Sequence, residues 1–230
     1  MKRKTTTATG MSPQKQKPKI QSIQIPRTMK LELKSVDNPG NSTLFKTSGV
    51  PPTGLLLNGV AQGAAMYQRV GNKIQMKGLQ IRGNLLNAAT CIEGCLRMVI
   101  VYDRQPNGAL ATWNTVFQMR DSAGTTSSNT FAMINVDQRE RFVILRDKFW
   151  HAPSVTYTGG VQTNGPSYPT DSEWDVDEYI KLKGLKCTFQ GDTSGIASIS
   201  TGSILMFLCV NGTNDSYSLS WNTRLRYYDA

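Results

Sequence analysis

Apolar and polar residues alternate along much of the chain after residue 27, and this alternation is the main structural signal. In residues 28–34, Met29, Leu31 and Leu33 take every second position, which predicts a half-buried strand. Comparable runs predict seven more strands, and no internal repeat or long helical pattern lies between them. The eight predicted strands cover residues 28–34, 73–86, 94–103, 141–150, 179–183, 185–190, 203–210 and 218–228.

The second of these strands contains a break in its alternation. Ile74 and Met76 follow one phase, whereas Leu79 and Ile81 follow the other. The phase slips at Gly78, and a glycine at such a slip is typical of a β-bulge. The pattern therefore predicts one long strand with a bulge at this glycine.

The strand at 203–210 is apolar on both faces, which predicts a central position in a sheet. Cys187 and Cys209 lie inside apolar strands and are predicted to be small core residues. Four cysteines are too few and too scattered for a disulfide scaffold. Cys91 and Cys95 form one pair without the second pair that a structural zinc site needs.

The connections between the predicted strands are very unequal. Segments 37–72, 105–138 and 152–175 are long, and unstructured connections longer than about 15 residues are uncommon unless they are functional. Asn38-Pro39-Gly40 and Pro51-Pro52 predict turns. One short helix is predicted at 113–119, with Thr112 as its N-cap. The fold class is therefore predicted to be all-β, an eight-stranded single jelly roll of the type that occurs in viral capsids and lectins.

Residues 1–26 differ from the rest of the chain in composition. They are rich in Lys, Gln, Thr and Pro and contain almost nothing to bury. Such a segment cannot offset its ordering entropy, and its prolines interrupt any helix. We therefore predict a disordered basic arm at 1–26 and a jelly-roll domain at 27–230.

The positive charge is concentrated at the N-terminal end. The net charge is +10; residues 1–35 hold nine Lys or Arg and one acid, a net +8, whereas residues 36–230 hold 17 and 15, a net +2. A strongly charged segment on a nearly neutral domain indicates binding to a polyanion. The alternative is a tail that only improves solubility.

We expect these N-terminal cations to neutralise phosphates and release counterions, which requires no base sequence. The predicted nucleic-acid contacts in this segment are Lys2, Arg3, Lys4, Lys15, Lys17, Lys19, Arg27, Lys30 and Lys34. Short basic runs also serve as nuclear import signals. The candidates for import are Lys2, Arg3, Lys4, Lys15, Lys17 and Lys19.

Three residues of the last predicted strand share one face. Arg224, Arg226 and Tyr228 would form a basic and aromatic patch on which bases could stack. The alternative is a solvated strand face whose arginines pair with acids. The alternation does not say which way this face points.

A cluster of acids precedes and enters the strand predicted at 179–183. Hard carboxylate oxygens suit Ca²⁺ at subunit contacts, although the spacing matches no EF-hand loop. The alternatives are a solvated loop or a partner for a basic patch on another subunit. The candidate Ca²⁺ ligands are Asp171, Glu173, Asp175, Asp177 and Glu178.

Enzymatic motifs are missing from the sequence. There is no Gly-x-Ser-x-Gly, no His-Glu-x-x-His and no Walker or dinucleotide loop. His151, the only histidine, has no nucleophile and acid placed around it to suggest a triad. The sequence therefore predicts no enzyme and no cofactor. The longest apolar run, 204–210, is far short of the roughly 20 residues of a membrane span, and no secretory signal is predicted.

Four segments resemble, in the same order, motifs of the coat proteins of geminiviruses and related circular, Rep-encoding single-stranded DNA viruses. These segments are 68–73 (QRVGNK), 98–106 (MVIVYDRQP), 137–146 (DQRERFVILR) and 224–229 (RLRYYD). They resemble "RVGK", "(M/V)-x-x-(L/V)-x-D-R-x-P", "RDRYQVLR" and "R-I-x-x-Y-D" in those proteins. The resemblance covers about residues 65–229, and the arm matches in character only.

The resemblance implies a coat protein that assembles into an icosahedral shell, of 60 copies by family likeness, around a circular single-stranded DNA genome. It implies that the arm points inward and serves in nuclear import, with host import machinery and a receptor or vector as further partners. The protein would then reside in the virion and, during infection, in the host nucleus, without membrane insertion. A non-capsid nucleic-acid-binding module, a satellite-like RNA virus coat and a jelly-roll lectin stay open as alternatives.

Overall fold

A computed structural model describes residues 32–43, 45–46, 53–87, 94–152, 157–158, 161–162, 173–211 and 217–229. The predicted arm, the boundary between residues 26 and 27, and the start of the first predicted strand lie outside these residues. So do Asp171 and much of the predicted connection 152–175.

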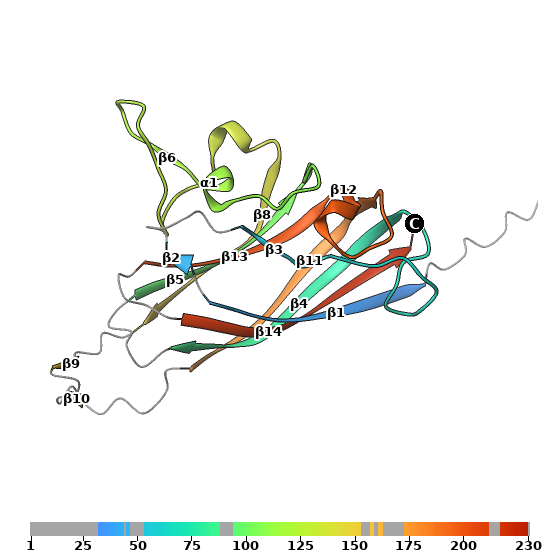
Figure 1. Ribbon diagram of the computed structural model, residues 1–230, viewed down its shortest axis with the longest axis horizontal. Helices are drawn as coiled ribbons and strands as arrows, with labels where there is room; N and C mark the ends of the chain where they lie inside the picture. The colour runs from blue at the N-terminus through green and yellow to red at the C-terminus, as the bar shows by residue number, and fades with distance from the viewer. Residues whose placement is uncertain are drawn as a thin grey trace, which may run out of the picture. The chain divides into compact units, whose positions relative to one another are not determined.

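Within the described residues, most strands belong to two five-stranded sheets (Figure 1). The first sheet has the order β1-β14-β4-β11-β12, with bounds Leu33–Thr43, Tyr217–Asp229, Lys73–Asn87, Glu173–Phe189 and Ile199–Thr201. The second has the order β2-β13-β5-β8, with bounds Phe45–Lys46, Ser203–Asn211, Gly94–Asp103 and Phe142–Ala152, and β3 (Leu55–Leu56) also pairs with β13. Two small hairpins join β6 (Met119–Arg120) to β7 (Thr126–Ser127) and β9 (Tyr157–Thr158) to β10 (Val161–Gln162).

The pairing of the strands is that of a jelly roll. Taking β2 and β3 together as the second strand, the eight sheet strands in chain order are β1, β3, β4, β5, β8, β11, β13 and β14. The first pairs with the last, the third with the sixth and the fourth with the fifth, all antiparallel. The second pairs with the seventh, antiparallel through β3 and parallel through β2. One long hairpin folded across itself into two sheets gives this order. The predicted fold class is confirmed, and the structure adds the pairing order.

The bulge predicted at Gly78 is present. In both neighbouring pairings the register of β4 passes from Met76 directly to Gly78, so Lys77 is the extra residue. The inserted residue restores the phase, and Ile74, Met76 and Leu79 are therefore all buried in the same core between the sheets.

Strand β13 is buried on both faces, as predicted for residues 203–210. Ile204, Met206 and Leu208 face the core between the two sheets. Leu205 and Phe207 face a second core on the other side of the same sheet. The apolar run 204–210 therefore has a buried environment on both faces of the strand.

The second core lies beneath the long connection that joins β5 to β8. This connection contains the short helix α1 (Trp113–Val116) and packs over the outer face of the second sheet (Figure 1). The rings of Trp113 and Phe117 lie 4.2 Å apart, and both contact Phe207 of β13. The predicted helix 113–119 is too long, because Phe117 already adopts extended backbone at the C-cap. Thr112 is the N-cap residue, as predicted, but its hydroxyl bonds to that of Thr115 and makes no capping hydrogen bond to the backbone.

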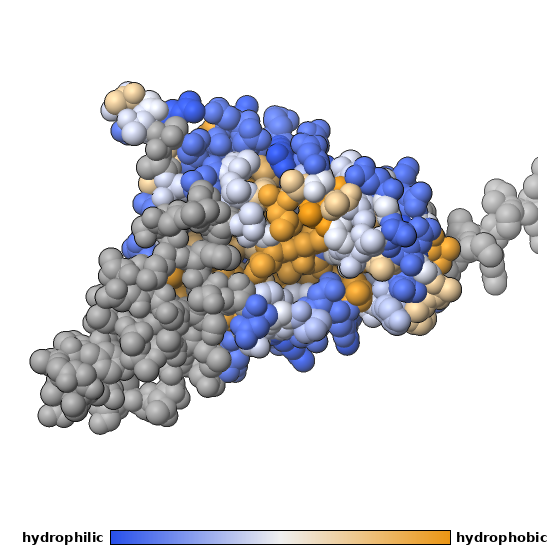
Figure 2. Space-filling model, in the orientation of Figure 1, coloured by the Kyte–Doolittle hydropathy of each residue, from blue (hydrophilic) through white to orange (hydrophobic). Residues whose placement is uncertain are grey.

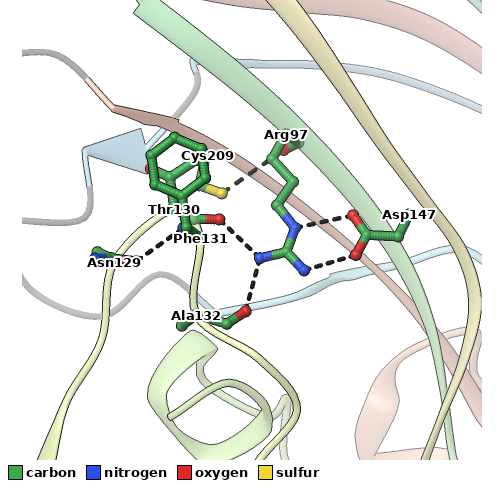
Figure 3. Close-up of polar contacts among 7 residues, drawn as sticks. All are labelled: Arg97, Asn129, Thr130, Phe131, Ala132, Asp147 and Cys209. Carbon is green, nitrogen blue, oxygen red and sulfur yellow. Dashed lines mark hydrogen bonds and ion pairs between the residues drawn. The ribbon is translucent and has the colours of Figure 1, made fainter. Parts of the chain in front are cut away.

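Arg97 of β5 holds this connection against the sheet (Figure 3). Its Nε and Nη2 donate to the two carboxylate oxygens of Asp147 on β8, at 2.9 and 2.6 Å. Its Nη1 donates to the carbonyls of Thr130 and Ala132 in the connection, at 2.7 and 2.8 Å. The guanidinium also lies 4.9 Å from the ring centroid of Phe117. One buried cation thus joins both strands and the covering segment.

The first strand differs from its prediction in phase. Leu33 is exposed and Lys34 is buried, the reverse of the expected alternation. The reason is that Lys34 Nζ forms an ion pair with Asp229 Oδ2 at 2.8 Å and donates to the Gln68 carbonyl at 3.1 Å. Polar partners at the inner face therefore determine which residues of this strand face inward and which face solvent.

The predicted turn at Asn38-Pro39-Gly40 is wrong, because these residues lie within β1. Strand β1 is at the edge of its sheet, where a proline without an N–H group disrupts no further pairing. A Cβ atom at residue 40 would overlap the ring of Trp221, so glycine admits this ring beneath the strand. Residues that often form turns therefore have other functions here. Pro39 occupies an edge strand, and Gly40 makes room for the Trp221 ring.

The two strands predicted at 179–183 and 185–190 are one strand, β11. Lys183 and Gly184 have positive φ angles of 50° and 81°, and the pairing with β4 skips from Lys181 to Leu185. The glycine therefore marks an irregularity opposite the β4 bulge, after which the strand continues. In the sequence alone, a glycine that ends a strand looks the same as a glycine at an irregularity within a strand.

We predict that Arg97→Met lowers the free energy of unfolding by about 3 kcal/mol, because it leaves Asp147 and two carbonyls without their donor. Urea unfolding should show the loss, and hydrogen exchange should be fastest in residues 110–138. Arg139→Met is the matched control, since Arg139 is exposed and forms no ion pair among the described residues. Equal unfolding midpoints for the Arg97 variant and the unchanged chain would contradict this function of the arginine.

Candidate nucleic-acid interface

The outer face of the first sheet is the candidate interface, because it carries Arg224, Arg226 and Tyr228. The register places their neighbours on the other strands. Arg226 lies opposite Gly78, which lies opposite Lys181, while Tyr228 lies opposite Gln75, which lies opposite Lys186. These residues form two adjacent rows across β14, β4 and β11.

Cations gather at one end of this face. We call this the basic end, and it consists of Lys73, Lys77, Lys181, Lys186 and Arg226, all of them exposed. Toward the other end of the same strands the exposed side chains include Asp175 and Asp177. The charge therefore changes along the strands, and a polyanion would be attracted to the basic end.

The structure brings Tyr228 and Lys77 into direct contact. Lys77 Nζ donates to the Tyr228 hydroxyl at 3.1 Å and lies 5.4 Å from its ring centroid. Arg226 has no ion-pair partner among the described residues. Its guanidinium is therefore available to an external anion, as the sequence predicts for this strand face.

Arg224 is engaged by an acid instead. Its Nε and Nη2 donate to the two carboxylate oxygens of Asp37 on β1, at 2.7 and 2.6 Å. The hydrogen bonds from Arg224 lower the pKa of Asp37, and the carboxylate raises the pKa of Arg224. Of the two interpretations open for this residue, the structure therefore favours pairing with an acid.

Lys34 also has partners within the subunit. Its side chain is 5% exposed, and its amine contacts Asp229 and the Gln68 carbonyl. We therefore remove Lys34 from the predicted phosphate contacts. Its partner Asp229 also accepts a hydrogen bond from the Val70 backbone N–H at 3.3 Å.

The other predicted contacts of the N-terminal segment, from Lys2 to Lys30, lie outside the described residues. The described chain begins at Glu32, directly before β1. Leu33 is the register partner of Tyr228, so the chain enters the fold beside the basic end. The start of β1, to which the predicted arm is covalently linked, therefore lies next to the exposed cations.

The acidic candidates for Ca²⁺ do not form a loop where they are described. Asp175, Asp177 and Glu178 lie in β11, and alternation turns Glu178 inward and the other two outward. The Glu178 carboxylate accepts from Lys148 Nζ and Arg146 Nη2 of β8, both at 2.7 Å. This ion pair joins the two sheets. Asp171 and the side chain of Glu173 lie outside the described residues, in which no group of three or more potential metal ligands is found.

The four family-like motifs meet in pairs. Arg141, in the third motif, donates from Nε and Nη2 to the buried carboxylate of Asp103, in the second, at 2.9 and 2.8 Å. Val70 of the first motif donates to Asp229 of the fourth. These motif residues therefore stabilise the fold and do not form a site for chemistry.

Arg69 of the first motif is fully buried. Its guanidinium donates to the carbonyls of Val60, Gly71 and Gly191 and lies 4.1 Å from the centroid of the Phe189 ring. Burial lowers its pKa. One arginine thus fixes two neighbouring loops where they leave the first sheet.

The described cysteines are buried and free. Burial raises the pKa of both Cys187 and Cys209 to about 12, so both thiols stay protonated near neutral pH. This agrees with their prediction as core residues. Cys91 and the side chain of His151 lie outside the described part of the chain. Among the helices of that part, none has the length and apolar character needed to cross a membrane.

Sequence reasoning did not find the cations of β4 and β11 that complete the face. Lys77 belongs to the bulge, and Lys181 and Lys186 lie on either side of the irregularity in β11. Each is an ordinary exposed lysine in its own strand. Only the pairing order and register place them beside Arg226, and neither was available from the alternation.

We predict that Arg224→Gln raises the pKa of Asp37 toward the ordinary value near 4, because the variant loses the charged donors. Carboxyl NMR titration should show the shift, and Arg226→Gln is the control that should leave Asp37 unchanged. Since the folded pKa is lowered, any stabilisation by this exposed pair is present above pH ~4 and is lost as the pH falls through the folded value. An unshifted Asp37 in the Arg224 variant would show that the pairing does not form in solution.

Comparison with known proteins identifies the family. The model of the geminivirus coat protein/nuclear export factor BR1 family matches residues 1–230. Comparison with curated proteins finds no match. Among solved structures, one similar chain belongs to the "Structure of the Macrobrachium rosenbergii Nodavirus", with 11% sequence identity and a TM-score of 0.29. That similarity covers 95% of this chain and 61% of that chain, so this chain spans about three fifths of its length.

The resemblance seen in four ordered motifs and the match of the family model agree, and the family is one of structural coat proteins. The strand pairing independently gives the jelly-roll fold. The chain belongs to the geminivirus coat protein family.

Proposed function

We propose that this coat protein assembles into an icosahedral shell of 60 copies and packages a circular single-stranded DNA genome. Residues 1–26 act as a basic arm on the jelly-roll domain 27–230, and the basic end of the first sheet faces the genome. The observation that carries the proposal is that the arm-bearing end of β1 lies beside the exposed cations of β14, β4 and β11. The arm and the folded face thus present positive charge to the same polymer.

The N-terminal segment, comprising the arm and the residues directly after it, supplies most of the neutralising charge. Without Lys34, the N-terminal segment keeps eight cations, namely Lys2, Arg3, Lys4, Lys15, Lys17, Lys19, Arg27 and Lys30. If each meets one phosphate of a single strand, the logarithm of the binding constant falls with the logarithm of salt concentration with a slope of about −6. Such binding reads charge and not sequence, as packaging of a whole genome requires.

Subunit contacts need apolar surface, and the long connection between β5 and β8 exposes some. Phe131, Met133 and Val136 are exposed, with Met133 exposed to 77%. They line a depression of about 500 Å³ beside the β6–β7 hairpin. The Phe131 ring also stacks on Phe149 of β8, at 6.2 Å between centroids. We assign this patch to contacts between copies of the chain.

Elsewhere the surface is mixed. Figure 2 shows hydrophobic residues in the middle of one side, over β3 and the adjoining part of the sandwich, with hydrophilic residues above and below. Leu55 and Leu56 of β3 are half-buried and pack against the cores. The hydrophobic residues on this side are thus the exposed margin of the core. The patch around Met133 is different, because it belongs to the connection between β5 and β8.

We further propose that the arm directs the protein to the host nucleus before assembly. The six cations Lys2, Arg3, Lys4, Lys15, Lys17 and Lys19 are the candidates for recognition by host import machinery. In the virion the same residues would be occupied by the genome. A receptor or vector would contact the outer surface of the shell.

We predict that removal of residues 1–26 leaves the domain folded but abolishes packaging. The deletion removes six cations, so the salt slope of single-stranded DNA binding should become less steep by about 4. Circular dichroism checks the fold, and nuclease typing of purified particles, with electron microscopy, checks the contents. A truncated chain that still packaged a normal genome would refute the arm assignment; particles filled with RNA would refute the DNA genome.

We predict that Met133→Asp prevents or greatly weakens shell assembly, because each contact loses a buried side chain worth roughly 2 kcal/mol and gains a charge. Light scattering and negative-stain microscopy measure assembly, while circular dichroism checks the fold. Asn114→Asp, an exposed change on α1, is the control. Normal shells from the Met133 variant would show that this patch lies outside the contacts, and lone subunits from the unchanged chain would refute the shell itself.

A further inference from the structure

Tyr179 of β11 lies on the outer face of the first sheet, in an unusual position. It is 45% exposed, and its register partner is Gln80. A Cβ atom on Gly78 would lie 2.5 Å from the Tyr179 hydroxyl oxygen and 3.0 Å from the ring carbon Cζ. The ring therefore lies over Gly78 of β4, across the sheet, and does not project away from it. Any larger residue at position 78 would displace it.

Cations flank this ring at two positions. Gly78, beneath the ring, is the register partner of both Arg226 on β14 and Lys181 on β11. Arg226 and Lys181 are exposed and form no ion pair among the described residues. The nearest acid on the same face of the strand, Asp177, is directed to Arg82, with 3.4 Å between Arg82 Nε and Asp177 Oδ2. The ring thus stands between two free positive charges.

The tyrosine hydroxyl has no hydrogen-bond partner in the described part of the chain, in contrast to Tyr102 and Tyr228. The fold therefore does not use the polar end of Tyr179. What the position offers is an aromatic face on a rigid sheet, open to solvent and bordered by cations. Such a surface is what single-stranded nucleic acids require, since unpaired bases stack on aromatic rings while cations bind the phosphates.

We propose that Tyr179 stacks an unpaired base of the packaged strand, with Gly78 leaving room for the ring over the sheet and Arg226 and Lys181 binding the flanking phosphates. The inference rests on the proposed packaging function and adds a base contact to the sequence-independent charge contacts. The occupant is single-stranded, because bases in a duplex are already stacked on one another. Stacking needs only a π face and so accepts any base.

The test compares two ligands that have the same charge but differ in bases. Fluorescence anisotropy of the full-length chain, at a concentration too low for assembly, measures binding of labelled oligothymidylate about ten nucleotides long and of an abasic oligomer of equal length. We expect the unchanged chain to prefer the thymidylate by about tenfold. Tyr179→Leu should lose this preference and keep its affinity for the abasic oligomer. Tyr179→Phe should retain the preference.

Two further variants sharpen the result. Gly78→Ala keeps the tyrosine but removes the room for its ring, so it should also reduce the preference. Tyr67→Leu is the matched control, because Tyr67 is 60% exposed but lies in the loop before β4 and not on a strand of the candidate face. It should bind both oligomers as the unchanged chain does.

The possible failures are distinguishable. If the unchanged chain binds neither oligomer, the proposed packaging function is wrong. If it binds both equally, or if Tyr179→Leu still prefers the thymidylate, the stacking site is wrong while packaging by charge stands. Loss of the preference in the control Tyr67→Leu would also overturn the assignment to Tyr179.

Discussion

The double-sided burial of the second sheet is the constraint on which the rest of this structure depends. Strand β13 is apolar at every position from 204 to 210, so both of its faces must be covered. One face packs against the first sheet, and the other requires the long connection between β5 and β8, held by Arg97. Among the described residues, that connection packs over the outside of the second sheet, and none covers the outer face of the first sheet, where Lys77, Lys181 and Arg226 are exposed. A long polymer would therefore lie along the first sheet more readily than along the second.

The arginines of this subunit have two functions, one for buried arginines and one for exposed arginines. Arg69 and Arg97 are buried, and each donates to several carbonyls or to a carboxylate, so they fix loops and strands to one another. Arg226 is exposed on the candidate face and forms no ion pair among the described residues. The motifs that carry the family likeness include the buried arginine Arg69 and the partly buried Arg141. The family likeness in this chain thus includes scaffold arginines and, in the fourth motif, the exposed Arg226, whereas Lys77, Lys181 and Lys186 of the candidate face lie outside the motifs.

The sequence alone was sufficient to predict strands in which apolar side chains face the core and polar side chains face solvent. The bulge at Gly78 and the central position of 203–210 follow from apolar alternation, and both are present. It failed where a polar residue is buried by a distant partner, as Lys34 is by Asp229, since such a partner is not visible locally. The candidate face was only partly predictable for the same reason. Arg226 and Tyr228 share a strand, but Tyr179 joins them only through the register across β4.

The arm and the face would act together because they are covalently linked at one place. Residues 1–31 could extend by at most about 100 Å, so the arm can follow a strand beyond its own subunit, whereas the face is fixed. Once arm cations hold the strand by charge, its bases stay near the face at a high effective concentration, and a weak stacking contact becomes sufficient. Repetition of this pair of contacts in every copy would order the polymer against the shell without selecting a sequence. Such a division of tasks would explain why the net charge is +8 in residues 1–35 and only +2 in residues 36–230, where the fold contributes geometry.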